Sequence, residues 1–412
     1  MRGPVVVVGG GAAGIIAAWR AHSLGAPLVL LEKTDRLGTK ILISGGGKCN
    51  VTHAGPVESV LKAFKREEAV FLRPSFYRFP PTEIVQMLAD RGLQLYTRDD
   101  GRMFPLDADA KDVVACLSHY LTGVDVRMET PVTGIEPGRG VWIGETLLET
   151  DHVVLCVGGS SFPKTGTTGD GYAWARSLGH QVVPVRAALA PVEFEGVLSD
   201  PNAGVSLRDV LLRARQSGKV IDKWRGDVLF THRGLSGPAV LGITRSVAEE
   251  WDKGPVDLEV DLAPDTPFET LQTDLATWKQ HNPNAKLAHA LEEFVPSKLV
   301  ARLLDSAHIH PETSAQRLAK KEANKLVETL KSWRLGRVSK VLFDKGEVVA
   351  GGVSLDEVDP KTMRSQKIGG LYLAGEILDI AGPVGGYNLQ AAWSTGYVAG
   401  ESAAQDWLAT RV

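Results

Sequence analysis

A glycine-rich turn between an apolar strand and a helix constrains the fold of this chain more than any other feature. Residues 5–8 are four consecutive valines, as expected for a buried parallel strand. They lead directly into the sequence Gly-Gly-Gly-Ala-Ala-Gly at 9–14, and residues 15–23 then have a helical pattern. A second apolar run at 27–31 ends at Glu32. This order of strand, glycine turn, helix, strand and carboxylate predicts a dinucleotide-binding βαβ unit.

The glycines at positions 9, 11 and 14 are each expected to have a separate mechanical role. Gly9 allows the tight turn out of the strand, Gly11 lets the backbone approach a pyrophosphate, and Gly14 lets the helix pack closely on the strand. The helix N-terminus adds N–H groups and the positive end of a dipole. Glu32 is expected to accept hydrogen bonds from ribose hydroxyls, which favours FAD or NAD over NADP. A flexible glycine turn that binds nothing is the alternative.

Two later glycine segments favour FAD over NAD. The first, Ser-Gly-Gly-Gly-Lys-Cys-Asn at 44–50, has a backbone that can lie flat against a ligand. The second follows a predicted strand at 371–374, and its Glu376 is suited to ribityl hydroxyls. Gly385-Gly386 then begins a helix expected over about 388–404, whose N-terminus would face the N1–C2 edge of a flavin. A plain turn between strand and helix is the alternative explanation of these two glycines.

Several motifs, taken in chain order, carry a resemblance to a known family. Through them the chain resembles the BaiN-like bacterial NAD(P)/FAD-dependent oxidoreductases, a group that includes aminoacetone oxidase-like flavoproteins within the glutathione-reductase and fumarate-reductase superfamily. The resemblance implies bound FAD and an inserted pair of subdomains, and it implies no particular substrate. The substrate-clamping Arg and His pattern of fumarate reductases is not found, which argues against dicarboxylate reduction. The motifs lie at residues 44–50, 101–105, 158–172, 229–238, 351–353, 374–379 and 385–390.

The predicted fold class is α/β, with a discontinuous Rossmann-like FAD-binding domain and two inserted subdomains. The FAD-binding domain is expected over 1–187 and 345–412. A β-rich, barrel-like insert is expected over 188–265, where short apolar runs are separated by glycine and proline. A helical insert is expected over 266–344, with Leu326, Leu330 and Trp333 on one apolar helix face.

The residues expected to bind FAD are the glycine segments and their flanking residues. The superfamily resemblance implies that Gly158-Gly159, after a predicted strand at 153–157, approaches the adenosine or pyrophosphate. It also implies that Val132 meets adenine through its backbone. The full set is Gly9, Gly11, Ala12, Ala13, Gly14, Glu32, Lys33, Thr39, Lys40, Ser44, Gly45, Gly46, Gly47, Lys48, Cys49, Asn50, Val132, Gly158, Gly159, Gly375, Glu376, Gly385, Gly386, Tyr387, Asn388 and Leu389.

The catalytic residues stay unassigned from the sequence, with four candidates. Cys49 would react as a thiolate, or else fill space as a small packed side chain. Lys164, with Asp170 in the same loop, would line the substrate site or only order the loop. His232 would act as general acid or base, and Arg233 would bind an anionic substrate. The alternative for both is that they stabilise a turn.

Composition and missing motifs narrow the remaining classes of function. A net charge of −3 gives no general attraction to nucleic acid or anionic lipid, and the three cysteines form no C-x-x-C pair. No metal-binding motif, signal peptide or membrane-spanning stretch is recognised, so a cytoplasmic protein without metal is expected. The lysines at 320, 321 and 325 form either a nucleic-acid or partner surface or a solvated helix face. The oligomeric state is not predicted.

The function expected from these residues is that of an FAD-dependent oxidoreductase. A hydride would pass between a small organic substrate and flavin N5. Because a second strand-linked G-x-G-x-x-G is missing from the sequence, any NAD(P)H is expected to dock only transiently. The alternatives are a tRNA-modifying flavoprotein that binds nucleic acid and a non-catalytic FAD-dependent regulator.

Overall fold

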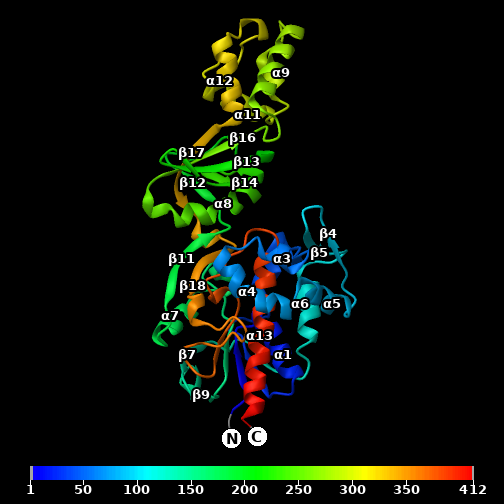
Figure 1. Cartoon of the computed structure of the whole chain (residues 1–412), viewed down its shortest axis with the longest axis vertical. Helices are drawn as coiled ribbons and strands as arrows, with labels where there is room; N and C mark the ends of the chain where they lie inside the picture. The colour runs from blue at the N-terminus through cyan, green and yellow to red at the C-terminus, as the bar shows by residue number, and fades with distance from the viewer. Residues whose placement is uncertain (1–2, 411–412) are drawn as a thin grey trace. The chain divides into compact units, whose positions relative to one another are not determined.

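The computed structural model describes residues 3–410, which form two compact units (Figure 1). The discontinuous unit contains the residues up to 186 and from 347 onward, and the inserted unit contains residues 187–346. Each unit has a hydrophobic core of its own. The predicted α/β class, with a Rossmann-like part, a β-rich part and added helices, is confirmed. Among the described residues, no helix has both the length and the apolar character needed to cross a bilayer.

A five-stranded parallel sheet forms the centre of the discontinuous unit. Its order is β19-β10-β1-β2-β6, so the glycine turn leaves the middle strand. The strand β1 is fully buried, which explains why all four of its residues are apolar. The strands are β1 (Val5–Val8), β2 (Leu28–Leu31), β6 (Asp125–Arg127), β10 (Val153–Leu155) and β19 (Leu371–Leu373).

Two helices from opposite ends of the chain pack against each other on this unit. Figure 1 shows α13 (Tyr387–Ala409) in red running beside α1 (Ala12–Ser23) in blue. Small residues make the contact close, because Gly396 lies on the backbone of Ala13 and Gly400 on that of Ala17. The helix α13 is longer at its C-terminal end than the sequence pattern predicted. A hydrogen bond of 2.9 Å from the Trp407 indole to the Gly3 carbonyl oxygen binds its last turns to the N-terminal segment.

Smaller sheets and helices complete the discontinuous unit. The sheets β3-β5-β4 and β7-β8-β9 are three-stranded, and β11 pairs with β18. Short segments that matter for the site are α2 (Thr39–Ile43), η1 (Ser44–Gly47), η2 (Pro163–Thr165) and η7 (Gly375–Ile377). The other elements are β3 (Thr52–His53), α3 (Val57–Leu61), α4 (Arg66–Arg78), α5 (Pro81–Ala89), β4 (Leu95–Thr97), β5 (Arg102–Pro105), α6 (Ala110–His119), β7 (Val132–Glu136), β8 (Gly140–Ile143), β9 (Thr146–Glu149), α7 (Asp170–Ser177), β11 (Val182–Ala188), β18 (Val348–Val353) and η6 (Leu355–Glu357).

The inserted unit is built on a closed six-stranded barrel of order β12-β15-β14-β13-β16-β17. The barrel strands are β12 (Val192–Phe194), β13 (Ser206–Gln216), β14 (Lys219–Phe230), β15 (Gly234–Ser236), β16 (Val256–Asp261) and β17 (Trp333–Val341). The helices are α8 (Pro238–Glu249), α9 (Phe268–His281), α10 (Leu287–Leu291), α11 (Ser297–Ser306) and α12 (Lys320–Lys331), with the short turns η3 (Trp251–Lys253), η4 (Ala315–Arg317) and η5 (Phe343–Lys345). A barrel is present where the sequence predicted a β-rich, barrel-like insert, and its strand β17 comes from the range predicted to be helical.

The helical interpretation of Trp333 is wrong. The helix α12 ends at Lys331, and Trp333 begins β17, where it pairs with Val260 of β16 and is fully buried. A spacing of i, i+4, i+7 therefore runs across a helix end into a strand. Local periodicity fails here because the pairing that closes the barrel joins strands more than 70 residues apart.

Candidate functional site

The first glycine turn, between β1 and α1, is open at Gly11. This residue is the N-cap of α1 with ordinary extended backbone angles, and a Cβ placed on it would meet no atom of residues 3–410 within 4 Å. The first helical bond runs from the Ile15 N–H to the Gly11 carbonyl oxygen, at 3.0 Å. The N–H groups of Ala12, Ala13 and Gly14 therefore precede the helix's own bonding pattern. An open turn lined by N–H groups at a helix N-terminus fits a pyrophosphate.

The glycines on either side of Gly11 are required by close packing. Gly9 has φ +100°, and a side chain there would collide with the Cys156 carbonyl group in β10's continuation. A side chain at Gly14 would collide with the Gly9 carbonyl oxygen. These two positions hold helix and strand together, whereas Gly11 leaves space that the protein itself does not fill.

Glu32, buried at the end of β2, clamps the same turn. Its Oε2 accepts the Gly10 N–H at 2.6 Å, and its Oε1 accepts both the N–H and the hydroxyl of Thr34 at 2.8 Å. Oε2 keeps one lone pair for a further donor. The expected bond to a ribose hydroxyl stays a prediction, and the carboxylate has a second role that the sequence did not suggest.

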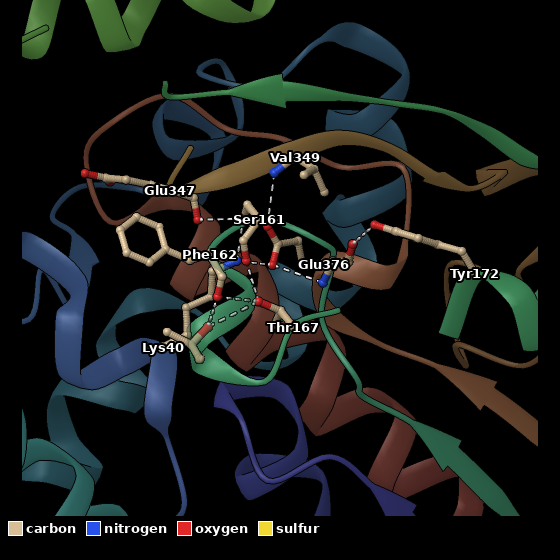
Figure 2. Close-up of polar contacts among 10 residues, drawn as sticks. Lys40, Ser161, Phe162, Thr167, Tyr172, Glu347, Val349 and Glu376 are labelled. Carbon is tan, nitrogen blue, oxygen red and sulfur yellow. Dashed lines mark hydrogen bonds and ion pairs between the residues drawn. The ribbon is translucent and has the colours of Figure 1, made fainter. Parts of the chain in front are cut away.

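A cluster around Lys40 and Glu376 joins four separate segments of the chain (Figure 2). The Lys40 ammonium lies 2.6 Å from Glu376 Oε2 and 2.9 Å from the Ser161 hydroxyl oxygen. Glu376 also accepts the N–H of Gly159 at 3.2 Å and that of Val349 at 3.1 Å. The ion-paired side chains of Lys40 and Glu376 are both largely buried. Both Glu376 oxygens thus have protein donors, in addition to the ribityl contact predicted for this residue.

A second lysine binds the same loop further along the chain. Lys33 lies 2.7 Å from Asp170 Oδ2 and 2.7 Å from the Thr168 hydroxyl oxygen. Within the loop, the Thr167 hydroxyl donates to the Ser161 carbonyl oxygen (Figure 2). Lys33 and Lys40, both on the segment after β2, therefore hold the loop that begins at Gly158-Gly159. These contacts favour the loop-ordering alternative for Asp170.

Replacing Lys40 with methionine is expected to lower the free energy of unfolding by about 2 kcal/mol. The reason is that Glu376 would keep its negative charge in a largely buried place without its cation, which falls between the exposed and the fully buried cases. The double variant Lys40→Met, Glu376→Gln is expected to recover part of the loss. Urea unfolding of the cofactor-free proteins measures both changes in the free energy of unfolding. The control is Lys164→Met, which replaces an exposed lysine of the neighbouring loop. Equal stability of all four proteins would contradict this.

The loop at 44–50 and the glycines at 385–386 are joined directly. With its amide oriented to suit its neighbours, Asn50 accepts the Gly386 N–H at 2.9 Å and donates to the Thr52 carbonyl oxygen at 3.2 Å. His53 Nδ1 lies 3.1 Å from the Gly385 carbonyl oxygen. Gly386 has φ +86°, and a Cβ there would lie 2.5 Å from the Thr52 carbonyl group. The structure thus brings together the two segments in which the sequence placed the flavin.

The N-terminus of α13 resembles that of α1 in its hydrogen bonding. Its first helical bond runs from the Gln390 N–H to the Gly386 carbonyl oxygen, so the N–H groups of Tyr387, Asn388 and Leu389 precede the helical pattern. The Asn388 side chain accepts the Gly382 N–H and donates to the Gly382 carbonyl oxygen, both at 2.8 Å. The Asn388 side chain therefore ties the chain at Gly382 to the start of this helix.

Cys49 is not set up as a reactive thiolate. Its side chain is fully buried, and this burial raises the pKa of the Cys49 thiol to about 12, against a smaller opposing effect of a hydrogen bond with Ser44. A thiol with such a pKa is protonated at neutral pH, and reactivity follows the thiolate. The backbone at Cys49 has φ +56°, so this residue shapes the end of the glycine loop.

The other predicted residues have diverse surroundings. Lys48 and Lys164 are exposed, Thr39 begins α2, and Val132 begins β7. His232 and Arg233 belong to the inserted unit, where both side chains are exposed and Arg233 lies 3.5 Å from Glu193. Their suggested roles stay predictions.

Sequence reasoning missed several residues that complete the site. Ser161 and Val349 bind the Lys40–Glu376 pair, and Thr52 and His53 meet the segment that begins α13. For Ser161 and Val349 no local pattern marks the role. For Thr52 and His53 the signal available was their closeness to Asn50.

Comparisons with known proteins agree with the motif resemblance. The profile of the HI0933-like protein Rossmann domain matches residues 3–402. A "Ribosomal RNA dihydrouridine synthase" of Escherichia coli is 30% identical over 418 residues, covering 100% of this chain and 99% of that protein. A "3-dehydro-bile acid delta(4,6)-reductase" of Clostridium scindens is 33% identical over 408 residues, covering 97% and 98%. The solved 3-ketosteroid delta1-dehydrogenase of Sterolibacterium denitrificans is similar in fold, with TM-score 0.54, 16% identity and coverage of 98% and 100%. The BaiN-like resemblance is confirmed.

Proposed function

Because this chain belongs to the HI0933-like family of Rossmann-domain proteins, we propose that it is an FAD-dependent oxidoreductase that reduces a carbon–carbon double bond conjugated to a carbonyl group. The observation that carries the proposal is the whole-length similarity to a synthase and a reductase whose names describe the same kind of chemical change. Forming a dihydrouridine adds two hydrogens across the double bond of uracil, next to a ring carbonyl. A delta(4,6)-reductase of a 3-dehydro substrate adds hydrogens to double bonds conjugated to a ketone.

The described residues fit FAD in the orientation that the two helix N-termini define. The open turn at Gly11 would hold the pyrophosphate, and Glu32 the adenosine ribose. The segments 44–50 and 385–389 would hold the flavin, with the Lys40–Glu376 cluster near the ribityl chain. When bound, FAD supplies the hydride chemistry that amino-acid side chains lack, and the protein supplies position and electrostatics.

The favoured substrate is a small cyclic enone. The inserted unit contains 22 lysines and arginines against 22 aspartates and glutamates, so it offers no net attraction to phosphates. A uracil base in RNA is the second candidate, which the relative from Escherichia coli favours. NAD(P)H is the proposed electron donor, docking transiently because the sequence contains one strand-linked dinucleotide motif.

The test is anaerobic reoxidation of the flavin. Purified protein carrying FAD is reduced with NADH or NADPH and mixed with 2-cyclohexen-1-one, with a 4-en-3-oxo steroid, or with unmodified ribosomal RNA. Return of the yellow colour with an enone, and a product two hydrogens heavier, supports the small-molecule proposal. Reaction with RNA alone, together with binding that weakens as salt rises, supports the second candidate. A protein that binds no FAD, or that reacts with none of the three acceptors, would refute both candidate substrates.

A further inference from the structure

We propose that His53 donates the proton in this double-bond reduction, an inference that rests on the proposed function and adds a catalytic residue to it. His53 follows the first of the two segments assigned to the flavin, and its imidazole contacts the second. It is the last residue of β3, three positions after Asn50, and it contacts Gly385 and Tyr387 at the start of α13.

The contacts of His53 fix both its orientation and its tautomer. Nδ1 lies 3.1 Å from the Gly385 carbonyl oxygen, which can only accept a hydrogen bond. In the neutral ring the proton is therefore on Nδ1, and Nε2 is the nitrogen that gains and loses a proton. The ring also stacks on Tyr387, with centroids 4.5 Å apart and planes 21° apart. A carbonyl that orients one imidazole nitrogen while the other exchanges protons is the usual arrangement of a histidine acid or base.

The Nε2 edge of the His53 imidazole packs against a glycine. Gly101 has φ +84°, and a Cβ at this position would collide with Nε2 and lie 2.7 Å from Cε1 of the ring. The His53 side chain is half-buried, so it is neither sealed in the core nor freely solvated. The absence of a side chain at position 101 thus gives the imidazole the room that it fills.

Other ionisable groups of the same segments are poorly suited to give a proton at neutral pH. Burial raises the pKa of the Cys49 thiol to about 12, and burial followed by the charge of Asp100 raises the pKa of the Tyr387 hydroxyl. Lys40 and Glu376 are engaged with each other at 2.6 Å. An imidazole is the side chain whose ordinary titration range lies closest to neutral pH.

In the proposed step with an enone, the π bond between the two carbons breaks and two C–H bonds form. The carbon β to the carbonyl receives a hydride with its electron pair from the reduced FAD of the proposed function, and the carbon α to the carbonyl receives a proton from Nε2 of the protonated His53. The substrate gains two electrons, FAD loses two, and the neutral imidazole takes its next proton from water.

Charged and titratable groups lie around His53 on the elements that pack against β3. On β5, Arg102 is directly opposite His53, and its guanidinium lies 2.6 Å from Asp100. The hydrogen bond from Arg102 holds the pKa of the Asp100 carboxyl below its usual range, so the two charges are paired. On α13 the neighbouring titratable group is Tyr387. The helix α5, which also packs against β3, contributes buried apolar residues, while its Glu83 is exposed.

The experiment compares the FAD-loaded wild type with His53→Gln, which keeps a polar side chain of similar size but cannot titrate. The first readout is the spectrum of oxidised FAD between pH 5 and 9. The wild type is expected to show a one-proton spectral change that His53→Gln lacks. The second readout separates the half-reactions. Flavin reduction by NADPH is expected to change less than about twofold, and reoxidation by 2-cyclohexen-1-one to slow by about 100-fold or more and lose its pH dependence, as for removal of a general acid.

Two further variants keep the result unambiguous. His22→Gln, at the far end of α1, makes the same substitution at a half-buried histidine and is expected to match the wild type. His53→Ala is expected to regain part of the reoxidation rate when free imidazole is added. If His53→Gln keeps the wild-type spectral titration and reoxidation rate, the inference is overturned and the proposed function stands. If the wild type binds FAD but reduces none of the three acceptors, the proposed function fails and the inference with it.

Discussion

Replacing Gly11 with valine is expected to give a folded protein that purifies without colour. The position has ordinary backbone angles and no neighbour of the described chain within 4 Å of a new Cβ, so the fold tolerates the side chain. The same side chain would occupy the place proposed for the pyrophosphate. We expect the dissociation constant for FAD to rise by at least about 100-fold, which corresponds to roughly 2.8 kcal/mol. The flavin content of the purified protein tests the loss of colour, and titration of the cofactor-free protein with FAD measures the dissociation constant.

Gly369→Val is the matched control for this variant. Gly369 also has an ordinary φ and no atom of residues 3–410 within 4 Å of a new Cβ. It lies in the turn before β19, however, at the opposite end of that strand from Glu376. Added FAD is expected to raise the melting temperature of the wild type and of Gly369→Val, and to leave that of Gly11→Val unchanged. Normal FAD content in Gly11→Val would show that the pyrophosphate does not bind at this turn.

Replacing Gly396 with alanine is expected to destabilise the protein by about 3 kcal/mol. Alanine is the better helix former by about 1 kcal/mol, so helix propensity alone predicts the opposite sign. In α13, however, a Cβ at this position would collide with the Ala13 carbonyl oxygen and lie 2.9 Å from the carbonyl carbon. Backbone atoms cannot yield by changing rotamer, so α1 and α13 must separate. Chemical denaturation of the cofactor-free protein gives the free energy of unfolding.

The matched control is Gln405→Ala, on the exposed face of the same helix. It is expected to change stability by less than about 0.5 kcal/mol. Since Ala13 is in the first turn of α1, we also expect Gly396→Ala to bind FAD more weakly than Gln405→Ala. Wild-type stability in Gly396→Ala would mean that the two helices are not held as closely as Gly396 and Gly400 indicate.

The local features of the site were predictable because each depends on residues next to it in the chain. The turn after β1 requires glycine at position 9 for its positive φ, and an apolar run before it forms a buried strand. The segment at 44–50 likewise contains left-handed backbone at Gly45, Gly46 and Gly47. Such constraints depend only on consecutive residues, so spacing alone indicated the βαβ unit and the glycine loop.

The incorrect interpretation of Trp333 and the missing partners of Glu376 have one cause. Trp333 is a strand residue because β16 is available to pair with it, and Glu376 is held by Lys40, 336 residues earlier in the chain. Neither relation leaves a periodic or compositional signal. Pairing and ion contacts between distant segments depend on which elements pack together.

The sequence by itself determined the dinucleotide turn, the α/β class and the family, since backbone conformation at glycines and the period of apolar residues are local properties. Only the tertiary structure decided which side chains meet around that turn. His53 and Gly385 are 332 residues apart and come within hydrogen-bonding distance because the start of α13 packs against β3, where Gly386 lies on the Thr52 carbonyl group. A contact of that kind exists only after the core has formed, and so it could not be inferred from the order of residues.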